Sequence, residues 1–267
     1  MAFSIQHSAF GISPARPLLE STWMARGRAR VGCSGWEYKH RRGNFYAEAV
    51  PRAKWFEHYA SVFDTVEINN SFYRLPERAT FAAWARRAPR RFEFAVKASR
   101  FLTHMKKLKE PEEPLERLFS RMQALGRHLG PVLYQLPPGW KLNLDRLRYF
   151  LDALPRRARH VMEFRDPTWY DREVCRLLDR RGVALCLHDM PGSATARERV
   201  GPFVYVRFHG ATSKYGGGYA VDRLRSWAEW LNAQRDASSD VYAYFNNDVG
   251  GHAPRDAVTL RRLLEVG

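Results

Sequence analysis

Residues 64–74 of the chain read DTVEINNSFYR, and this stretch predicts the end of a buried strand. Val66 and Ile68 recur at alternate positions, which is the period of a β-strand. If these two side chains pack on helices, Glu67 and Asn69 point the other way, into the space that the sheet encloses. Burying polar side chains without partners is costly, so other strands must supply the partners. The stretch therefore predicts a polar interior that several strands share.

Strand-like and helix-like segments alternate along the chain. Strands are predicted at 30–34, 64–69, 92–97, 132–136, 161–165, 183–188, 204–209 and 241–246. Helices are predicted near 52–63, 77–87, 114–127, 143–153, 171–181, 222–234 and 254–265, with a weaker one near 193–199. This alternation indicates an α/β fold, and eight strand–helix units match a (β/α)8 TIM-type barrel of about 250 residues. No GxGxxG follows the first strand, which disfavours a dinucleotide-binding sheet.

The first 29 residues differ from the remainder of the chain. They show no apolar periodicity and contain no signal-peptide core. We expect residues 1–29 to be a disordered extension or a mis-annotated start, with translation beginning at Met24 instead of Met1. Residues 30–267 would then form a single barrel domain, and a hydrophobic content of 45% supports a substantial core.

The predicted loops differ in length at the two ends of the strands. Loops from helix to strand are short, such as 89–91 and 181–182, whereas loops from strand to helix are long, such as 35–51, 98–114 and 210–221. Long loops within a compact domain are usually functional, and barrel active sites lie at the carboxyl ends of the strands. We therefore expect the site at that end.

Polar residues end most of the predicted strands, where a merely packed interior would carry Val, Ile or Leu. Seven strands are expected to direct a ring of polar side chains into the interior. The predicted catalytic residues are Glu67, Glu163, Asp189 and His209. The predicted substrate-binding residues are Trp36, Tyr38, Asn69, Tyr73, Lys97, Gln135, Arg165, Arg207, Asn246 and Asn247.

Several motifs resemble those of the YecE-like family, which carries domain of unknown function 72. They are GCSGW at 32–36, FY at 45–46, TVEINNSFY at 65–73, QLPP at 135–138, EFR at 163–165, RFHG at 207–210 and FNN at 245–247. The resemblance runs from about Val31 to the C-terminus and implies a TIM-type barrel, but no particular activity. His40 departs from the pattern, because such sequences often carry a second Trp after the Gly-Trp motif.

A divalent metal at the ring is possible but is not favoured. No HxH or HExxH spacing is present, and the cations Lys97, Arg165 and Arg207 would oppose a metal ion. The candidate ligands are Glu67, Glu163, Asp189, His209 and Asp248.

Acid–base or hydrolytic chemistry on a small anionic ligand is the favoured function. Glu163 is expected to stay ionised beside Arg165, and so to act as a base or an orienting group. His209 is either a proton shuttle or a hydrogen-bonded core histidine. Glu67 is either part of the site or the structural partner of a buried cation. Arginine in the ring would hold a phosphate or carboxylate through paired hydrogen bonds.

The charge of the chain leaves a second class of partner open. There are 44 Lys and Arg against 28 Asp and Glu, a net charge of +16, and this excess favours anionic partners. Nucleic acid is therefore the alternative partner, held by Arg100, His104, Lys106, Lys107 and Lys109, although such a charge run is also typical of a solvated loop. A non-catalytic scaffold is the third interpretation.

The cysteine content bears on location. Cys33, Cys175 and Cys186 form no CxxC pair, and no apolar run approaches the length of a membrane span. We expect reduced thiols, no membrane contact and a cytoplasmic protein.

Overall fold

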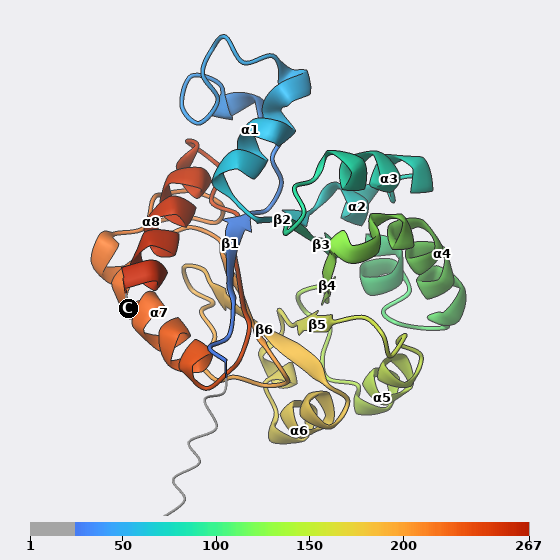
Figure 1. Cartoon of the computed structure of the whole chain (residues 1–267). Coiled ribbons are helices and arrows are strands. Elements are labelled where there is room, and N and C mark those ends of the chain that lie inside the picture. Colours follow the sequence, from blue (N-terminus) through green and yellow to red (C-terminus); the bar gives the residue numbers. More distant parts are fainter. Residues whose placement is uncertain (1–24, 267) are drawn as a thin grey trace, which may run out of the picture.

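The computed structural model, which describes residues 25–266, confirms the predicted barrel. Parallel strands form a nearly closed ring with helices outside it (Figure 1). The strands are β1 (Ala29–Cys33), β2 (Thr65–Ile68), β3 (Glu93–Lys97), β4 (Leu129–Gln135), β5 (His160–Glu163), β6 (Val183–Asp189), β7 (Val204–Phe208) and β8 (Val241–Phe245). All eight predicted strands are therefore present, with small differences at their ends.

Helices follow the strands in the predicted order. They are α1 (Trp55–Val62), α2 (Asn70–Tyr73), α3 (Arg78–Arg87), α4 (Glu112–Met122), α5 (Leu144–Asp152), α6 (Arg172–Arg180), α7 (Val221–Asp236) and α8 (His252–Val266). Short turns are η1 (Lys39–Arg41), η2 (Arg52–Lys54), the π-helix η3 (Phe101–Met105), η4 (Gln123–His128) and η5 (Pro167–Trp169). Asn143 and Asp171 cap α5 and α6 by accepting a backbone N–H in the first turn, which fixes where these helices begin.

The weak helix predicted near 193–199 is wrong, because this segment bonds to β6 instead of to itself. The Thr195 N–H donates a hydrogen bond to the His188 carbonyl at 3.0 Å. The Val200 carbonyl accepts one from the Leu185 N–H at 3.2 Å. Backbone groups used in this way are not available for helical turns.

Two apolar clusters result from the alternation of side chains along the strands. Val66 and Phe94 belong to the outer cluster, between the strands and the helices. Leu133 and Tyr205 belong to the inner cluster, which fills the middle of the barrel. The polar ends of the strands lie beyond this inner cluster.

The barrel closes where β1 meets β2, the two edges of the sheet order β1-β8-β7-β6-β5-β4-β3-β2. There the hydroxyl of Tyr59, on α1, accepts from the Cys33 N–H at 2.8 Å and donates to the Thr65 carbonyl at 2.9 Å. A Cβ atom at Gly32 would lie 2.3 Å from that carbonyl oxygen. Glycine is therefore needed at position 32, and a tyrosine hydroxyl links the two edges.

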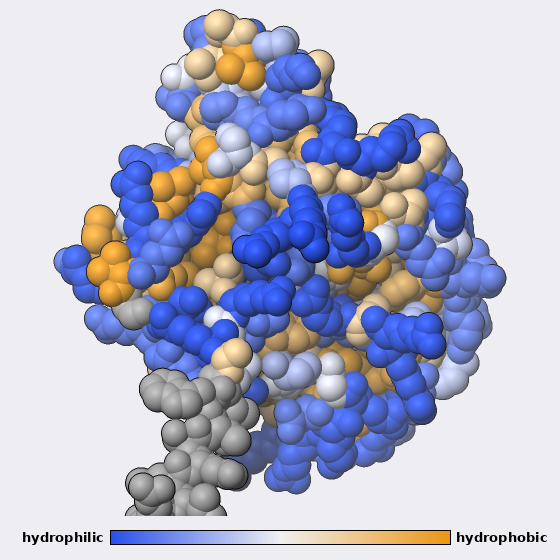
Figure 2. All heavy atoms as spheres, viewed as in Figure 1, coloured by the Kyte–Doolittle hydropathy of each residue, from blue (hydrophilic) through white to orange (hydrophobic). Residues whose placement is uncertain are grey.

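The surface is mostly hydrophilic in the view of Figure 2, including the centre of the visible face. Within residues 25–266, no helix combines the length and the hydropathy needed to cross a membrane. Of the extension predicted at residues 1–29, residues 1–24 lie outside the described residues, whereas Gly27 and Arg28 are hydrogen-bonded to the barrel and Ala29 begins β1.

Tyr59→Phe should lower the free energy of unfolding by about 1–3 kcal/mol, because a buried N–H and a buried C=O lose their shared partner. Urea denaturation measures the change. Tyr149→Phe is the matched control: this half-exposed phenol on α5 bonds to Glu112, and its loss should change the stability by less than about 0.5 kcal/mol. Equal effects of the two variants would contradict the role of the bridge.

A chain that begins at Met24 should melt cooperatively within a few degrees of the full chain. It keeps the contacts of the segment before β1, in which the Gly27 N–H donates to the Arg235 carbonyl and the Arg28 N–H donates to Asp240. A chain that begins at Val31 loses these bonds and the ion pairs of Arg30, so it should melt lower. Loss of the cooperative transition in the Met24 chain would show that the preceding residues support the fold.

Candidate active site at the carboxyl ends of the strands

A guanidinium group buried between two carboxylates lies at the carboxyl end of the barrel interior. Arg207, on β7, donates from Nη2 to Oε1 of Glu67 at 2.8 Å and from Nη1 to Oε2 of Glu163 at 2.9 Å. Glu67 comes from β2 and Glu163 from β5, and neither side chain is exposed. One arginine therefore joins three strands across the interior.

The remaining acceptor positions of Glu67 are also used. Ser34 donates to Oε1 at 2.7 Å, and Tyr205 donates to Oε2 at 2.6 Å. Both carboxylate oxygens are thus bound by hydroxyl groups in addition to Arg207. Hydrogen bonds to both oxygens offset the free-energy cost of burying the charged carboxylate.

Glu163 also pairs with Arg165, just beyond the end of β5. Burial alone would raise the pKa of Glu163, but the guanidinium groups of Arg165 and Arg207 hold it well below its usual range. Glu163 is therefore ionised, as the sequence predicts, and cannot donate a proton near neutral pH.

His209 follows β7 and is neutral. Its Nε2 accepts a hydrogen bond from Nη2 of Arg165 at 2.8 Å, and Nδ1 lies 3.3 Å from the side-chain amide of Asn246. Burial lowers the pKa of His209 to about 3, although nearby Glu163 acts in the opposite direction. At neutral pH this histidine orients Arg165 and carries no charge.

Lys97 ends β3, and among residues 25–266 no carboxylate forms an ion pair with it. Its ammonium nitrogen lies 4.1 Å from the centre of the Phe72 ring. Burial, helped by the positive charge of Arg207, lowers the pKa of Lys97 to about 7. The amine is therefore partly protonated at neutral pH and free to pair with an anion.

A pocket of about 250 Å³ lies between the loop after β1, the end of β2 and α3, and its lining includes no residue of the Arg207 cluster. It is lined by Trp36, Tyr38, Asn69 and Trp84, among others. The Tyr38 hydroxyl donates to the Ser34 carbonyl at 2.8 Å, which fixes the ring over the pocket. Oδ1 of Asn69 is buried and has no hydrogen-bond partner among the described residues, so it is open to a donor from a ligand.

Asp189 does not belong to the ring, contrary to the prediction. It ends β6 on the outward face, where it accepts from Nε1 of Trp227 at 2.8 Å and from Nε of Arg223 at 3.2 Å. The error is one of alternation, because His188 takes the inward position. His188 was missed although it shares this face with Cys186, and its buried Nδ1 lacks a hydrogen-bond partner within the described part of the chain.

Two predicted substrate-binding residues also lie elsewhere. Asn247 points outward from the end of β8 and donates to Asp256 at 2.8 Å and to the Gly217 carbonyl at 3.0 Å. Tyr73, on α2, is 76% exposed at the surface. Gln135 is placed as expected, with its oxygen 3.4 Å from Nη1 of Arg207.

The loops at this end are held by an ion pair that the sequence did not reveal. Arg41 is fully buried, and its Nε and Nη2 each donate to Asp248 at 2.9 Å. This bidentate pair joins the loop after β1 to the loop after β8. Because Asp248 is used in this way, it is not free to bind a metal.

No group of three or more His, Cys, Asp or Glu within residues 25–266 is arranged to hold a metal ion.

The charge of the basic loop after β3 is partly neutralised, because Glu110 pairs with Lys106 at 3.2 Å and with Lys109 at 3.7 Å. In that loop, His104 packs on Phe72, and burial lowers its pKa to about 4.

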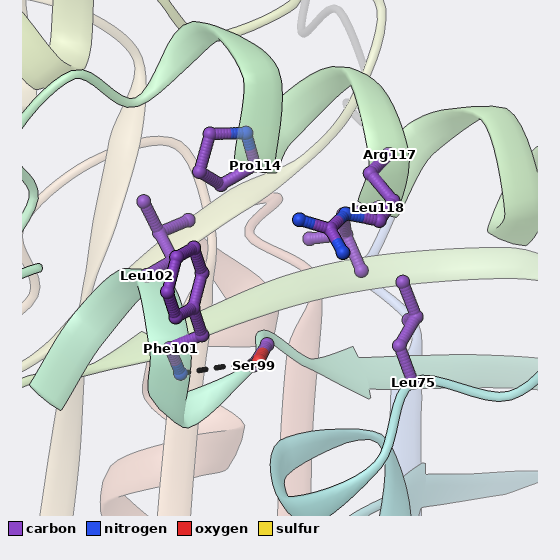
Figure 3. Close-up of a pocket in the computed structure, with 7 residues that line it drawn as sticks. All are labelled: Leu75, Ser99, Phe101, Leu102, Pro114, Arg117 and Leu118. Atoms are coloured by element: carbon purple, nitrogen blue, oxygen red, sulfur yellow. Dashed lines mark hydrogen bonds between the residues drawn. The ribbon is translucent and has the colours of Figure 1, made fainter. Parts of the chain in front are cut away.

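A separate hollow of about 230 Å³ lies between η3 and α4 (Figure 3). Leu102, Pro114 and Leu118 form much of its wall, and Arg117 at its edge pairs with Glu113 at 2.8 Å. Its lining includes none of the predicted site residues, so the candidate site remains the cluster around Arg207.

The fold and the position of this cluster define a TIM-type barrel with a polar site at the carboxyl ends of its strands. Residues 30–267 match the family described as "Protein of unknown function DUF72", and the chain belongs to this family. The predicted membership of the YecE-like family is thereby confirmed.

Relatives by sequence carry related names. The UPF0759 protein YunF of Bacillus subtilis (strain 168) is 24% identical over an alignment that covers 88% of this chain and 94% of that protein. The UPF0759 protein YecE of Escherichia coli (strain K12) is 29% identical over 133 residues, which cover 48% of this chain and 49% of that protein.

Solved structures share the fold. A DUF72 family protein from Thermotoga maritima superposes with a TM-score of 0.81 at 25% identity, covering 89% of this chain and 99% of that one. One from Enterococcus faecalis gives a TM-score of 0.74 at 18% identity, covering 90% and 96%.

Glu67→Gln should lower the free energy of unfolding by about 3 kcal/mol or more, because it removes the charge that neutralises one side of buried Arg207. Glu173→Gln is the control: this half-exposed residue pairs with Arg148 at the surface, and its loss should cost no more than about 1 kcal/mol. Urea denaturation of both variants gives the comparison. A Glu67→Gln protein as stable as the unmodified chain would show that Glu67 is dispensable to the fold, as the functional interpretation predicts.

Proposed function

We propose that this protein binds a small anionic molecule, bearing a phosphate or a carboxylate, at the carboxyl end of the barrel and carries out acid–base or hydrolytic chemistry on it. The observation that carries the proposal is the unpaired amine of Lys97 beside the Arg207 cluster. Both carboxylates of the cluster are already bound by arginine, and neither forms an ion pair with Lys97.

The charge balance supports an anion as ligand. Because Asp189 lies on the outer face, this cluster contains three basic side chains and two acidic ones. The basic residues are Lys97, Arg165 and Arg207, and the acidic residues are Glu67 and Glu163. An anion would restore the balance and would supply the partner that Lys97 lacks.

Lys97 is also the residue we propose for proton transfer. General acid–base catalysis is most effective when the pKa of the group lies near the working pH, and the pKa of Lys97 is lowered to about 7. Glu163 and His209 then orient Arg165, while Glu67 holds Arg207; these are positioning roles. Asn69, Tyr38 and Trp36 offer a pocket for the uncharged part of the ligand.

The nucleic-acid alternative has less support, because Lys106 and Lys109 share Glu110 and half-buried His104 packs on Phe72. A reducing compartment such as the cytoplasm suits the three free cysteines, of which Cys33 and Cys186 are buried.

Sulfate should raise the melting temperature, and the rise should be larger at about pH 6 than at about pH 8, because Lys97 is protonated below its pKa of about 7. The charge of sulfate does not change over this range, so the pH dependence reports the protein. A sugar monophosphate should also stabilise the chain, but its own second pKa of about 6 adds a pH dependence that sulfate does not have. Differential scanning fluorimetry at constant ionic strength measures both effects.

Two variants separate the candidate sites. Lys97→Gln should lose most of the stabilisation and its pH dependence, whereas the chain with Lys106, Lys107 and Lys109 all changed to Gln should keep both. The reverse result would move anion binding to the loop after β3 and favour the nucleic-acid alternative.

A further inference from the structure

A hollow of about 590 Å³ lies at the opposite end of the barrel, where the chain enters β1, β2, β3 and β4. Four exposed arginines line it: Arg28, Arg90, Arg91 and Arg127. They come from three loops that are distant in the sequence, and Arg90 and Arg91 are adjacent. The hollow is therefore a concave basic surface made by the fold.

The acidic residues of this hollow are already neutralised from within. Buried Arg30 pairs through Nη1 with Asp64 and through Nη2 with Glu93. Arg159 also pairs with Glu93, at 2.7 Å. Within residues 25–266, no carboxylate pairs with any of the four exposed arginines, so their charge is available to a ligand.

Arg30 adds a buried donor to the same hollow. Its Nε has no hydrogen-bond partner among the described residues, although the residue is only 8% exposed. A buried donor without a partner is unusual in a folded protein and calls for an explanation. An anion bound in the hollow would give the four exposed arginines the partner that they lack among the described residues.

We propose that this hollow binds a compact oligophosphate, namely three or more linked phosphates such as inorganic tripolyphosphate or the triphosphate of a nucleotide. Arginine recognises phosphate through paired hydrogen bonds, and arginines approaching from several loops suit a short ligand with several negative charges. Phe92, the aromatic residue of the lining, is 1% exposed and offers no face on which a base could stack. A single-stranded nucleic acid, which needs such platforms, is therefore the poorer match.

The site is independent of the one at the carboxyl ends. The inner apolar cluster, which includes Leu133 and Tyr205, fills the barrel between them. Residues at the amino ends of barrel strands commonly serve stability, so an oligophosphate bound there should stabilise the folded chain.

Isothermal titration of the full chain with tripolyphosphate tests the proposal. We expect one tightly bound ligand per chain, held about tenfold or more weakly by the double variant Arg90→Gln/Arg127→Gln. The control is Arg172→Gln/Arg176→Gln, which removes the same charge from exposed positions of α6 and should leave the affinity unchanged. Lys97→Gln should also leave it unchanged, which separates this site from the proposed substrate site.

Three results would overturn the proposal. The first is the absence of saturable binding at one ligand per chain. The second is an equal loss of affinity in the control variant. The third is that single-stranded RNA displaces tripolyphosphate at a lower concentration of phosphate groups than adenosine triphosphate does. The last result would instead identify a nucleic-acid surface.

Discussion

The charged contact of Arg207 with Glu67 and Glu163 is the interaction on which the carboxyl end of the barrel depends. Burying an arginine and two carboxylates is expensive, and the loss is offset only if every charge is paired and bonded. Here one guanidinium bonds to both carboxylates, and hydroxyl groups complete the shell of Glu67. Because the three residues come from β2, β7 and β5, the pairing also fixes the relative positions of these strands.

The interior is layered along the barrel axis. A charged layer around Arg207 lies at the carboxyl ends, a mostly apolar layer with Tyr205 and Leu133 lies in the middle, and a second charged layer around Arg30 lies at the amino ends. The two charged layers differ in which cationic side chains lack an ion-pair partner. In the layer at the carboxyl ends, Lys97 has no ion-pair partner among the described residues, and its pKa is lowered. In the layer at the amino ends, the exposed arginines around the hollow have no such partner.

The alternation of side chains along a strand explains what the sequence could predict and where it failed. The β7 pattern places Arg207 and His209 inside, and the observed pairing with Glu67 and Glu163 agrees with it. The same rule, applied to β6, excludes Asp189, because Asp189 alternates in step with the outward Leu185 and Leu187, whereas His188 shares the inward face of Cys186.

Other features depend on contacts between distant loops, which no local pattern encodes. The Arg41–Asp248 pair joins residues more than 200 positions apart, and nothing in either neighbourhood marks the partner. The Tyr59 bridge likewise requires knowing that β1 and β2 form the edges of the sheet.

The strand order has a consequence for how the chain is made. The first strand, β1, forms its backbone ladder with β8, the last strand, pairing Ala29 with Val241 and Cys33 with Phe245. During synthesis β1 emerges more than 200 residues before β8, its ladder partner. Contacts of such long sequence separation slow folding and leave an unpaired edge exposed meanwhile. A ribosome-bound chain therefore carries an open sheet until β8 has emerged.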